Sequence, residues 1–318
     1  MTDLVSAAIK DRLAIAGKIL IVSHVRPDGD AVGALLGLGL ALQNAGKQVQ
    51  MVLVDGVHPS FRHLQGAEQV RTTPEGSFDT YVVVDCADFK RVGKPLEPYG
   101  QPDINIDHHI TNQKFGKLNL IVPDAVATSA ILTDSLPAWG YTIIPPIAAA
   151  LLSGIITDTL GFRTSNMTPQ ALRQAAALME SGADLPLLYN RALISRSFQA
   201  ARYWGAGLSS LQRADGIVWG TLTLEDRAQA GYDSNDDADL INVISSIDES
   251  AIGMIFVEQA DGYVKVSWRA LQPGLDVSQV AKHFGGGGHA AAAGADIPGK
   301  LSEIQPSVLK TTREMLGL

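Results

Sequence analysis

Short apolar runs that each end in Asp or His constrain the fold of this 318-residue chain more than any other feature. The runs are KILIVSHV (18–25), QVQMVLVD (48–55), DTYVVVDCAD (79–88) and DINIDHH (103–109). Their length and continuous apolar character are typical of strands buried on both faces of a parallel sheet. Because open parallel sheets bind ligands at the carboxyl ends of their strands, we expect these polar residues to gather at one edge.

Helix signals separate and follow these runs. An Ala/Leu/Gly helix is predicted over about 31–45, ending at Gly46, and others over 127–139, 146–157 and 168–182. The last begins with Thr168 as N-cap and Pro169 at its first position. Further on, the pattern predicts a strand at 216–224, a hairpin at 252–270 turning at Asp261-Gly262, and a short helix at 276–284.

These elements predict an α/β protein with two domains. We expect an N-terminal doubly wound domain with a mostly parallel sheet (residues 1–190) and a helical linker (191–214). A smaller C-terminal α/β domain with a mixed sheet would follow (215–318).

The composition of the chain argues against several classes of function. The net charge of −8 disfavours binding of long duplex nucleic acid, which needs a basic face. The single cysteine, Cys86, excludes an intramolecular disulfide and a cysteine-based metal site. No apolar stretch is long enough for a membrane span and the N-terminus lacks a signal-peptide core, so we expect a cytoplasmic protein without a membrane partner. A homodimer is compatible with the sequence.

The segment HVRPDGDAVG (24–33) follows the first predicted strand and carries His24, Asp28 and Asp30. Two carboxylates so close repel each other unless a cation lies between them. Carboxylate oxygens bind hard divalent metals, and a histidine shifts the preference towards Mn or Zn. The alternative is that Asp30 only caps the following helix.

Two single aspartates stand at the ends of other elements. Asp85 ends the run YVVVD, where a strand-end Asp is often only a cap. Asp158 ends an apolar helical run, and a negative charge there opposes the helix dipole, which favours a functional role. Arg163, five residues later, could contact a phosphate, although a surface arginine is the commoner outcome.

Asp107, His108 and His109 form the densest group of ionisable residues. Neighbouring side chains in an extended segment point in alternate directions, so His108 cannot face the same way as both Asp107 and His109. One imidazole could bind a metal while the other contacts substrate, with Asp107 orienting a ring. A solvated turn is the alternative.

Taken together, these residues suffice for two cations that share a carboxylate, an arrangement suited to in-line phosphoryl displacement. No predicted strand is followed by a P-loop or a dinucleotide-binding motif.

The order HVRPDGDAVG, VVVD, IDHH and TDT resembles the DHH phosphoesterase superfamily, and VSWRA with GGGGHAAAAG resembles its DHH-associated substrate domain. The resemblance covers about residues 5 to 315. It implies two divalent cations, usually Mn²⁺, with Mg²⁺ or Co²⁺ as alternatives. One would be held by His24, Asp28 and Asp85, and the other by Asp30, Asp85, His108 and Asp158.

The resemblance also implies roles in catalysis and substrate binding. The catalytic residues would be His109, which touches the scissile phosphate, the bridging Asp85, and the supporting Asp107. The substrate would be bound by Arg269, Gly287, Gly288 and His289 of the second domain, with Arg163 as a further candidate.

Length and C-terminal motif favour the compact NrnA-like group of the superfamily. The resemblance of this chain to that group implies hydrolysis of one or both of two substrates. The first is very short oligoribonucleotides (di- to pentanucleotides), cleaved to mononucleotides, and the second is 3′-phosphoadenosine 5′-phosphate, cleaved to AMP. Three alternatives stay open: a linear or cyclic dinucleotide phosphodiesterase, an inorganic pyrophosphatase or polyphosphatase, and a metal-dependent nucleotide sensor without turnover.

Overall fold

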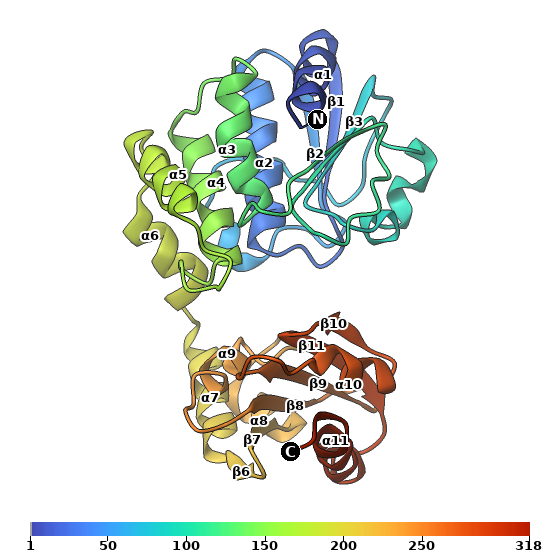
Figure 1. The fold of residues 1–318 in the computed structure, drawn as a ribbon, viewed down its shortest axis with the longest axis vertical. Helices are drawn as coiled ribbons and strands as arrows, with labels where there is room; N and C mark the ends of the chain where they lie inside the picture. The colour runs from blue at the N-terminus through green and yellow to red at the C-terminus, as the bar shows by residue number, and fades with distance from the viewer. Residues whose placement is uncertain (1) are drawn as a thin grey trace. The chain divides into compact units, whose positions relative to one another are not determined.

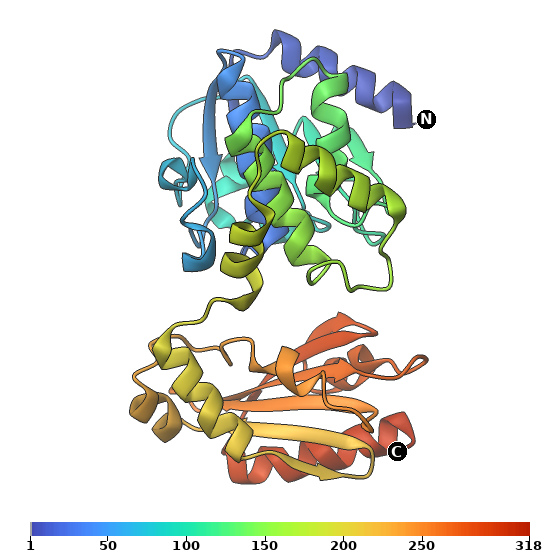
Figure 2. The same ribbon diagram turned by 90° about the vertical axis from the view of Figure 1, so that its left-hand side faces the viewer.

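The computed structural model describes residues 2–318, which form two compact units that divide between Ser195 and Arg196. Figures 1 and 2 show each unit as a sheet covered by helices. Within the described residues, no helix combines the length and the apolar character that a membrane span requires.

The first unit is built on a sheet of five parallel strands. They are β1 (Lys18–Val22), β2 (Gln48–Val52), β3 (Thr80–Val84), β4 (Ile104–Asp107) and β5 (Leu118–Ile121), in the order β2-β1-β3-β4-β5. Four of them confirm the predicted strands. The fifth, at the edge, was not predicted, because its sequence LNLI is short and mostly half-buried and so lacks a long apolar run.

Alternate strand residues serve two cores, which explains the continuous apolar runs. Ile19 and Ile21 pack with the helices on one face, whereas Leu20 and Val22 pack on the other face. The helices are α1 (Thr2–Ile15), α2 (Gly29–Asn44), α3 (Thr128–Ala138), α4 (Pro145–Asp158), α5 (Pro169–Glu180), α6 (Leu185–Tyr189) and the π-helical turn η5 (Asn190–Ile194). The 3-10 turns are η1 (Pro59–Phe61), η2 (Ala67–Gln69), η3 (Phe89–Val92) and η4 (Lys94–Tyr99). Thr168 caps α5 as predicted.

Helices α2 and α4 pack antiparallel with their backbones unusually close. A Cβ at Gly33 would lie 2.6 Å from the carbonyl oxygen of Ala150 and 2.9 Å from the nitrogen of Gly154. A Cβ at Gly37 would lie 2.4 Å from the side chain of Leu151. These glycines let the start of α2 and the end of α4 meet, which brings Asp30 and Asp158 to the same place.

The second unit has a mixed sheet of six strands in the order β10-β11-β9-β8-β7-β6, in which only β7 and β8 pair parallel. The strands are β6 (Gln212–Ala214), β7 (Ile217–Leu222), β8 (Ile252–Glu258), β9 (Tyr263–Ala270), β10 (Gly287–His289) and β11 (Ala292–Pro298). The helices are α7 (Phe198–Ser209), α8 (Leu224–Ala230), α9 (Leu240–Ile244), α10 (Val277–His283) and α11 (Leu301–Leu316). The first three pack on one face of the sheet, and α10 and α11 pack on the other.

This architecture confirms the predicted fold class, with a parallel sheet in the first unit and a mixed sheet in the second. The predicted hairpin is confirmed, since β8 and β9 pair antiparallel and Gly262 has φ +82° at their turn. The segment GGGGHAAAAG, for which no strand was predicted, contains β10 and the start of β11, which pair as a hairpin.

Candidate metal centre

The candidate site lies at the carboxyl ends of β1 and β3. These neighbouring strands mark the point where the strand order reverses, since β2 lies on one side of β1 and β3 on the other. Crevices form at such a switch point because the connections leave the sheet in opposite directions. His24 follows β1 and Asp85 follows β3, and both side chains are buried. The fold therefore brings together residues that are 61 positions apart in the sequence.

One group of possible metal ligands consists of His24, Asp28 and Asp85. The Nε2 atom of His24 lies 3.8 Å from Oδ2 of Asp28 and 3.7 Å from Oδ2 of Asp85. The other oxygen of Asp28 accepts hydrogen bonds from the backbone N–H groups of Asp30 and Ala31, both at 3.1 Å, so Asp28 caps α2. The alternative that Asp30 serves as this cap is therefore wrong.

A second group consists of Asp30, His108 and Asp158, whose ligand atoms all lie within 4.8 Å of one another. The Nε2 atom of His108 lies 3.4 Å from Oδ2 of Asp158 and 3.8 Å from Oδ1 of Asp85. Asp85 is thus close both to His24 of the first group and to His108 of the second, so its carboxylate lies between the two groups.

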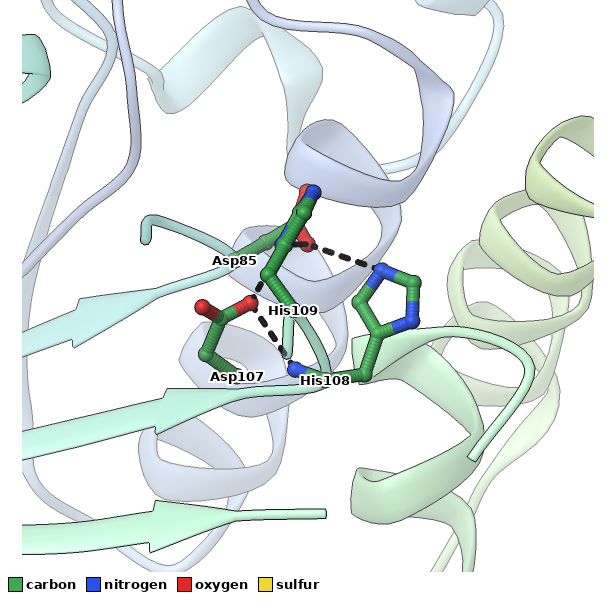
Figure 3. Close-up of side chains that lie close together, drawn as sticks. All are labelled: Asp85, Asp107, His108 and His109. Carbon is green, nitrogen blue, oxygen red and sulfur yellow. Dashed lines mark hydrogen bonds and ion pairs between the residues drawn. The ribbon is translucent and has the colours of Figure 1, made fainter. Parts of the chain in front are cut away.

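The triplet divides as the alternation of side chains predicts (Figure 3). Asp107 and His109 turn towards each other, with Nδ1 of His109 2.7 Å from Oδ1 of Asp107. The ring of His108 points away from Asp107 and towards Asp85 in Figure 3. Its Nε2 atom also lies 3.4 Å from Oδ2 of Asp158. The second oxygen of the buried Asp107 accepts a hydrogen bond from Nδ2 of Asn112 at 2.5 Å. Asp107 thus orients the ring of His109, and Asn112 in turn holds the carboxylate of Asp107 in place.

Charges crowd this site and shift its pKa values. Burial, together with the charge of Asp85, raises the pKa of Asp30 well above its usual value and that of Asp158 to about 6. Burial acts in the same direction on Asp85, but its contacts with His24 and His108 outweigh it and lower the pKa to about 2. The hydrogen bond to Asp107 raises the pKa of His109 to about 9.

The donor set fits divalent cations. Four carboxylates and two imidazoles converge within a few ångströms, and burial together with repulsion from neighbouring carboxylates raises the pKa values of Asp30 and Asp158. Cations between these groups would relieve that repulsion. The mixture of oxygen and imidazole ligands suits Mn²⁺ or Zn²⁺ better than Ca²⁺.

The structure adds residues that the sequence reasoning missed. Thr128 and Ser129, at the start of α3, donate hydrogen bonds to Asp30 and Asp85. The guanidinium of Arg91 lies 3.1 Å from Nδ1 of His24. An Ala-Thr-Ser sequence before an apolar helix marks a helix start, but nothing in it identifies a distant carboxylate as partner.

Arg163 does not join these groups. It is exposed, and its Nε donates to the carbonyl oxygen of Leu160 within the same loop. Cys86 is buried, and burial raises the pKa of its thiol to about 12.

The substrate-binding candidates of the second unit lie on neighbouring strands. Arg269 on β9 is directly opposite Ala292 on β11, and Ala292 is directly opposite His289 on β10. Residues directly opposite each other share a face of the sheet, so Arg269 and His289 flank a small side chain on one face. Gly288 has φ +144°, and a Cβ there would lie 2.5 Å from the carbonyl oxygen of Ala292, so the hairpin requires a glycine at this position.

The chain is similar to known proteins over its whole length. It is 36% identical to the bifunctional oligoribonuclease and PAP phosphatase NrnA of Thermus thermophilus, over 95% of this chain and 91% of that protein. It is 24% identical to the protein of the same name from Bacillus subtilis, over 90% and 91% of the two chains.

Solved structures share the fold. An exopolyphosphatase-related protein from Bacteroides fragilis superposes with a TM-score of 0.91 at 23% identity, over 99% of this chain and 98% of that one. The Mn²⁺ complex of RecJ from Thermus thermophilus has a TM-score of 0.55 at 15% identity, over 99% of this chain and 54% of RecJ.

Residues 18–155 match the N-terminal domain of the DHH family, and residues 221–316 match the DHHA1 domain. Both matches lie within the units that carry the clusters described above. With the identity to NrnA over nearly its full length, this chain belongs to the DHH family and, within it, to the members that carry a DHHA1 domain.

Proposed function

We propose that this chain is a divalent-metal-dependent phosphoesterase that hydrolyses very short oligoribonucleotides and 3′-phosphoadenosine 5′-phosphate. The observation that carries this proposal is the pair of ligand groups around Asp85, in a chain 36% identical to a bifunctional oligoribonuclease and PAP phosphatase. The net charge of −8 agrees with a substrate of a few nucleotides rather than a long duplex.

Two cations are proposed, one held by His24, Asp28 and Asp85 and the other by Asp30, Asp85, His108 and Asp158. Mn²⁺ is the preferred ion, supported by the mixed ligand set and by the Mn²⁺ complex of RecJ, which shares the fold. When bound, such cations neutralise phosphate charge and promote ionisation of the attacking water.

The residues of the chain then have distinct tasks. His109 holds a proton at neutral pH because Asp107 stabilises the imidazolium, and its Nε2 would donate to a phosphate oxygen as negative charge develops there. Asp107 orients the ring through Nδ1, and Asn112 keeps Asp107 in place.

The two units would share the work of binding and catalysis. Residues 1–190 would carry the reaction and residues 215–318 would bind the substrate. Of the predicted linker 191–214, the residues from Arg196 on, with α7 and β6, are part of the second unit. Arg269 and His289 would contact phosphate groups with charge-assisted hydrogen bonds, while Gly287 and Gly288 would let backbone N–H groups approach. Arg163 is a weaker candidate for phosphate contact, because it lies exposed in its own loop.

The test is a substrate comparison with purified protein and Mn²⁺. A dinucleotide, a pentanucleotide and 3′-phosphoadenosine 5′-phosphate are expected to be hydrolysed, and inorganic pyrophosphate and cyclic di-AMP much more slowly. Asp85→Asn should abolish turnover while retaining the fold. Preferential release of phosphate from pyrophosphate would refute the proposal, as would cation binding without turnover of any substrate.

Arg269 can be tested separately. Arg269→Gln should raise KM for the dinucleotide and leave Mn²⁺ affinity unchanged, because Arg269 lies in the second unit. Lys265→Gln is a matched control, since it removes a positive charge from the same face of β9, four residues away. Equal KM values for the two variants would exclude Arg269 from substrate binding.

A further inference from the structure

The start of helix α3 contacts two of the carboxylates around which the ligand groups are arranged. The backbone N–H of Thr128 donates to Oδ2 of Asp30 at 2.6 Å, and that of Ser129 donates to Oδ1 of Asp30 at 2.9 Å. Each oxygen of Asp30 therefore accepts one hydrogen bond and keeps a lone pair for another partner. The carboxylate is held in one orientation by a helix end, whose N–H groups favour negative charge.

The hydroxyl of Thr128 reaches the other carboxylate. Its Oγ1 lies 3.0 Å from Oδ1 of Asp85, and since a carboxylate only accepts, the hydroxyl is the donor. Thr128 thus bonds Asp30 on α2 through its backbone and Asp85 after β3 through its side chain. No other residue among 2–318 is hydrogen-bonded to both of these carboxylates.

These bonds are inaccessible to water. Thr128 and Ser129 are 0% exposed, and Asp30 and Asp85 are 1% exposed. Solvent cannot replace a lost partner at such a position, so the orientation of each carboxylate depends on the protein donors. A β-branched threonine also has restricted side-chain rotation, which limits where its hydroxyl can point.

Asp85 has a particular need for such support. Its φ of +53° lies in the left-handed region, which a residue with a side chain adopts only when its surroundings hold it there. Its Oδ2 faces His24 at 3.7 Å, and its Oδ1 faces His108 at 3.8 Å. A small rotation of the carboxylate would change both separations together.

We propose that Thr128 is a positioning residue that sets the spacing between the two cation-binding groups by bonding Asp30 and Asp85 at once. The inference rests on the proposed two-cation site and adds a residue that touches neither substrate nor cation. Removal of a residue that hydrogen-bonds and orients a metal ligand typically lowers metal affinity or activity by about 10- to 100-fold.

The test compares three variants by Mn²⁺ titration calorimetry, by electron paramagnetic resonance of the paired ions, and by hydrolysis of a dinucleotide. Thr128→Val removes the hydroxyl at constant shape and keeps the backbone bond to Asp30. Thr128→Ser restores the hydroxyl. Thr133→Val is the matched control, because Thr133 is buried in the same helix and its hydroxyl donates only to the carbonyl oxygen of Ser129, at 2.8 Å.

We expect Thr128→Val to weaken Mn²⁺ binding about 10-fold or more and to alter the signal of the ion pair, with kcat lowered and KM little changed. Thr128→Ser should bind Mn²⁺ within about threefold of the original protein, and Thr133→Val should match the original protein. The melting temperature in chelator should fall further for Thr128→Val than for Thr133→Val, because only Thr128→Val takes a donor from a buried carboxylate.

Equal Mn²⁺ affinity of Thr128→Val and Thr133→Val would overturn the inference while leaving the proposed function intact. A Thr128→Ser variant as impaired as Thr128→Val would also overturn it, since the hydroxyl would not be the cause. If the original protein bound no Mn²⁺, both the proposed function and the inference would fail.

Discussion

Gly154, on α4, offers a sharp test of how packing defines the site. A Cβ at this position would lie 2.0 Å from Oγ of Ser129 and 2.7 Å from Oδ1 of Asp30. Normal carbon contacts are about 3.5 Å or longer, so Gly154→Ala must displace Ser129, Asp30 or the helix itself. Both neighbours are buried, and neither can move into solvent.

The magnitude follows from two opposing effects. Overpacking of a buried position costs about 1–3 kcal/mol. The contacts of 2.0 and 2.7 Å place the cost in the upper part of that range, at about 2–3 kcal/mol. Replacing a helical glycine by alanine gains up to about 1 kcal/mol, so the net loss of stability should be about 1–2 kcal/mol. For a unit of this size, that corresponds to a fall in Tm of about 2–8 °C. Mn²⁺ affinity should fall as well, because Asp30 is one of the displaced groups.

Scanning calorimetry and Mn²⁺ titration measure the two effects. Gly205→Ala is the control, since Gly205 is also helical but its Cβ would meet nothing within 4 Å, and it should raise stability slightly. Ser129→Ala removes the hydroxyl that the new Cβ would meet first. Combined with Gly154→Ala, it should recover part of the loss. A Gly154→Ala protein as stable as Gly205→Ala, with unchanged Mn²⁺ affinity, would refute this reasoning.

Three further predictions concern the charges of the site. Removal of the cations by a chelator should lower the Tm of the first unit by about 5–10 °C, compared with protein in Mn²⁺ at 100 times its Kd. The Tm of the second unit should not change, and calorimetry with and without chelator measures both. Because the pKa of Asp158 is raised to about 6, a cation must displace a proton from it below that pH, so Mn²⁺ affinity should fall by up to about tenfold per pH unit as the pH drops below 6. Mn²⁺ titrations from pH 5 to 8 test this, and an unchanged affinity would contradict it. Asp107→Asn removes the main cause of the raised pKa of His109, so the alkaline limb of the kcat profile should move from about 9 towards 6.5; an unmoved limb would mean that His109 does not act as an acid.

Much of the fold could be predicted because local patterns determine it. The apolar runs before Asp85 and Asp107 are buried on both faces, and this leaves no solvent side to interrupt them. The edge strand β5 was missed for the opposite reason, since three of its four residues are only half-buried. The hairpin within GGGGHAAAAG was missed because glycine and alanine carry little strand signal.

The candidate site was predicted as a set of residue types but not as a geometry. His24, Asp85 and the triplet were predicted to lie at one edge of the sheet because each follows a strand, and the carboxyl ends of parallel strands all lie at the same edge. The partners from α3 were not predictable, because Thr128 lies 43 positions from Asp85 in sequence and 98 from Asp30. Helix packing alone brings them into contact.

The groups that would bind cations come from β1, α2, β3, the end of β4 and the end of α4, which together span residues 24 to 158. Cation uptake therefore requires contacts of long sequence separation, which form late in folding. A chain emerging during synthesis would hold only fragments of the site until α4 had packed against α2. Mn²⁺ binding would then report completed folding of the first unit, and a cell short of the ion would accumulate a less stable form that is open to proteolysis.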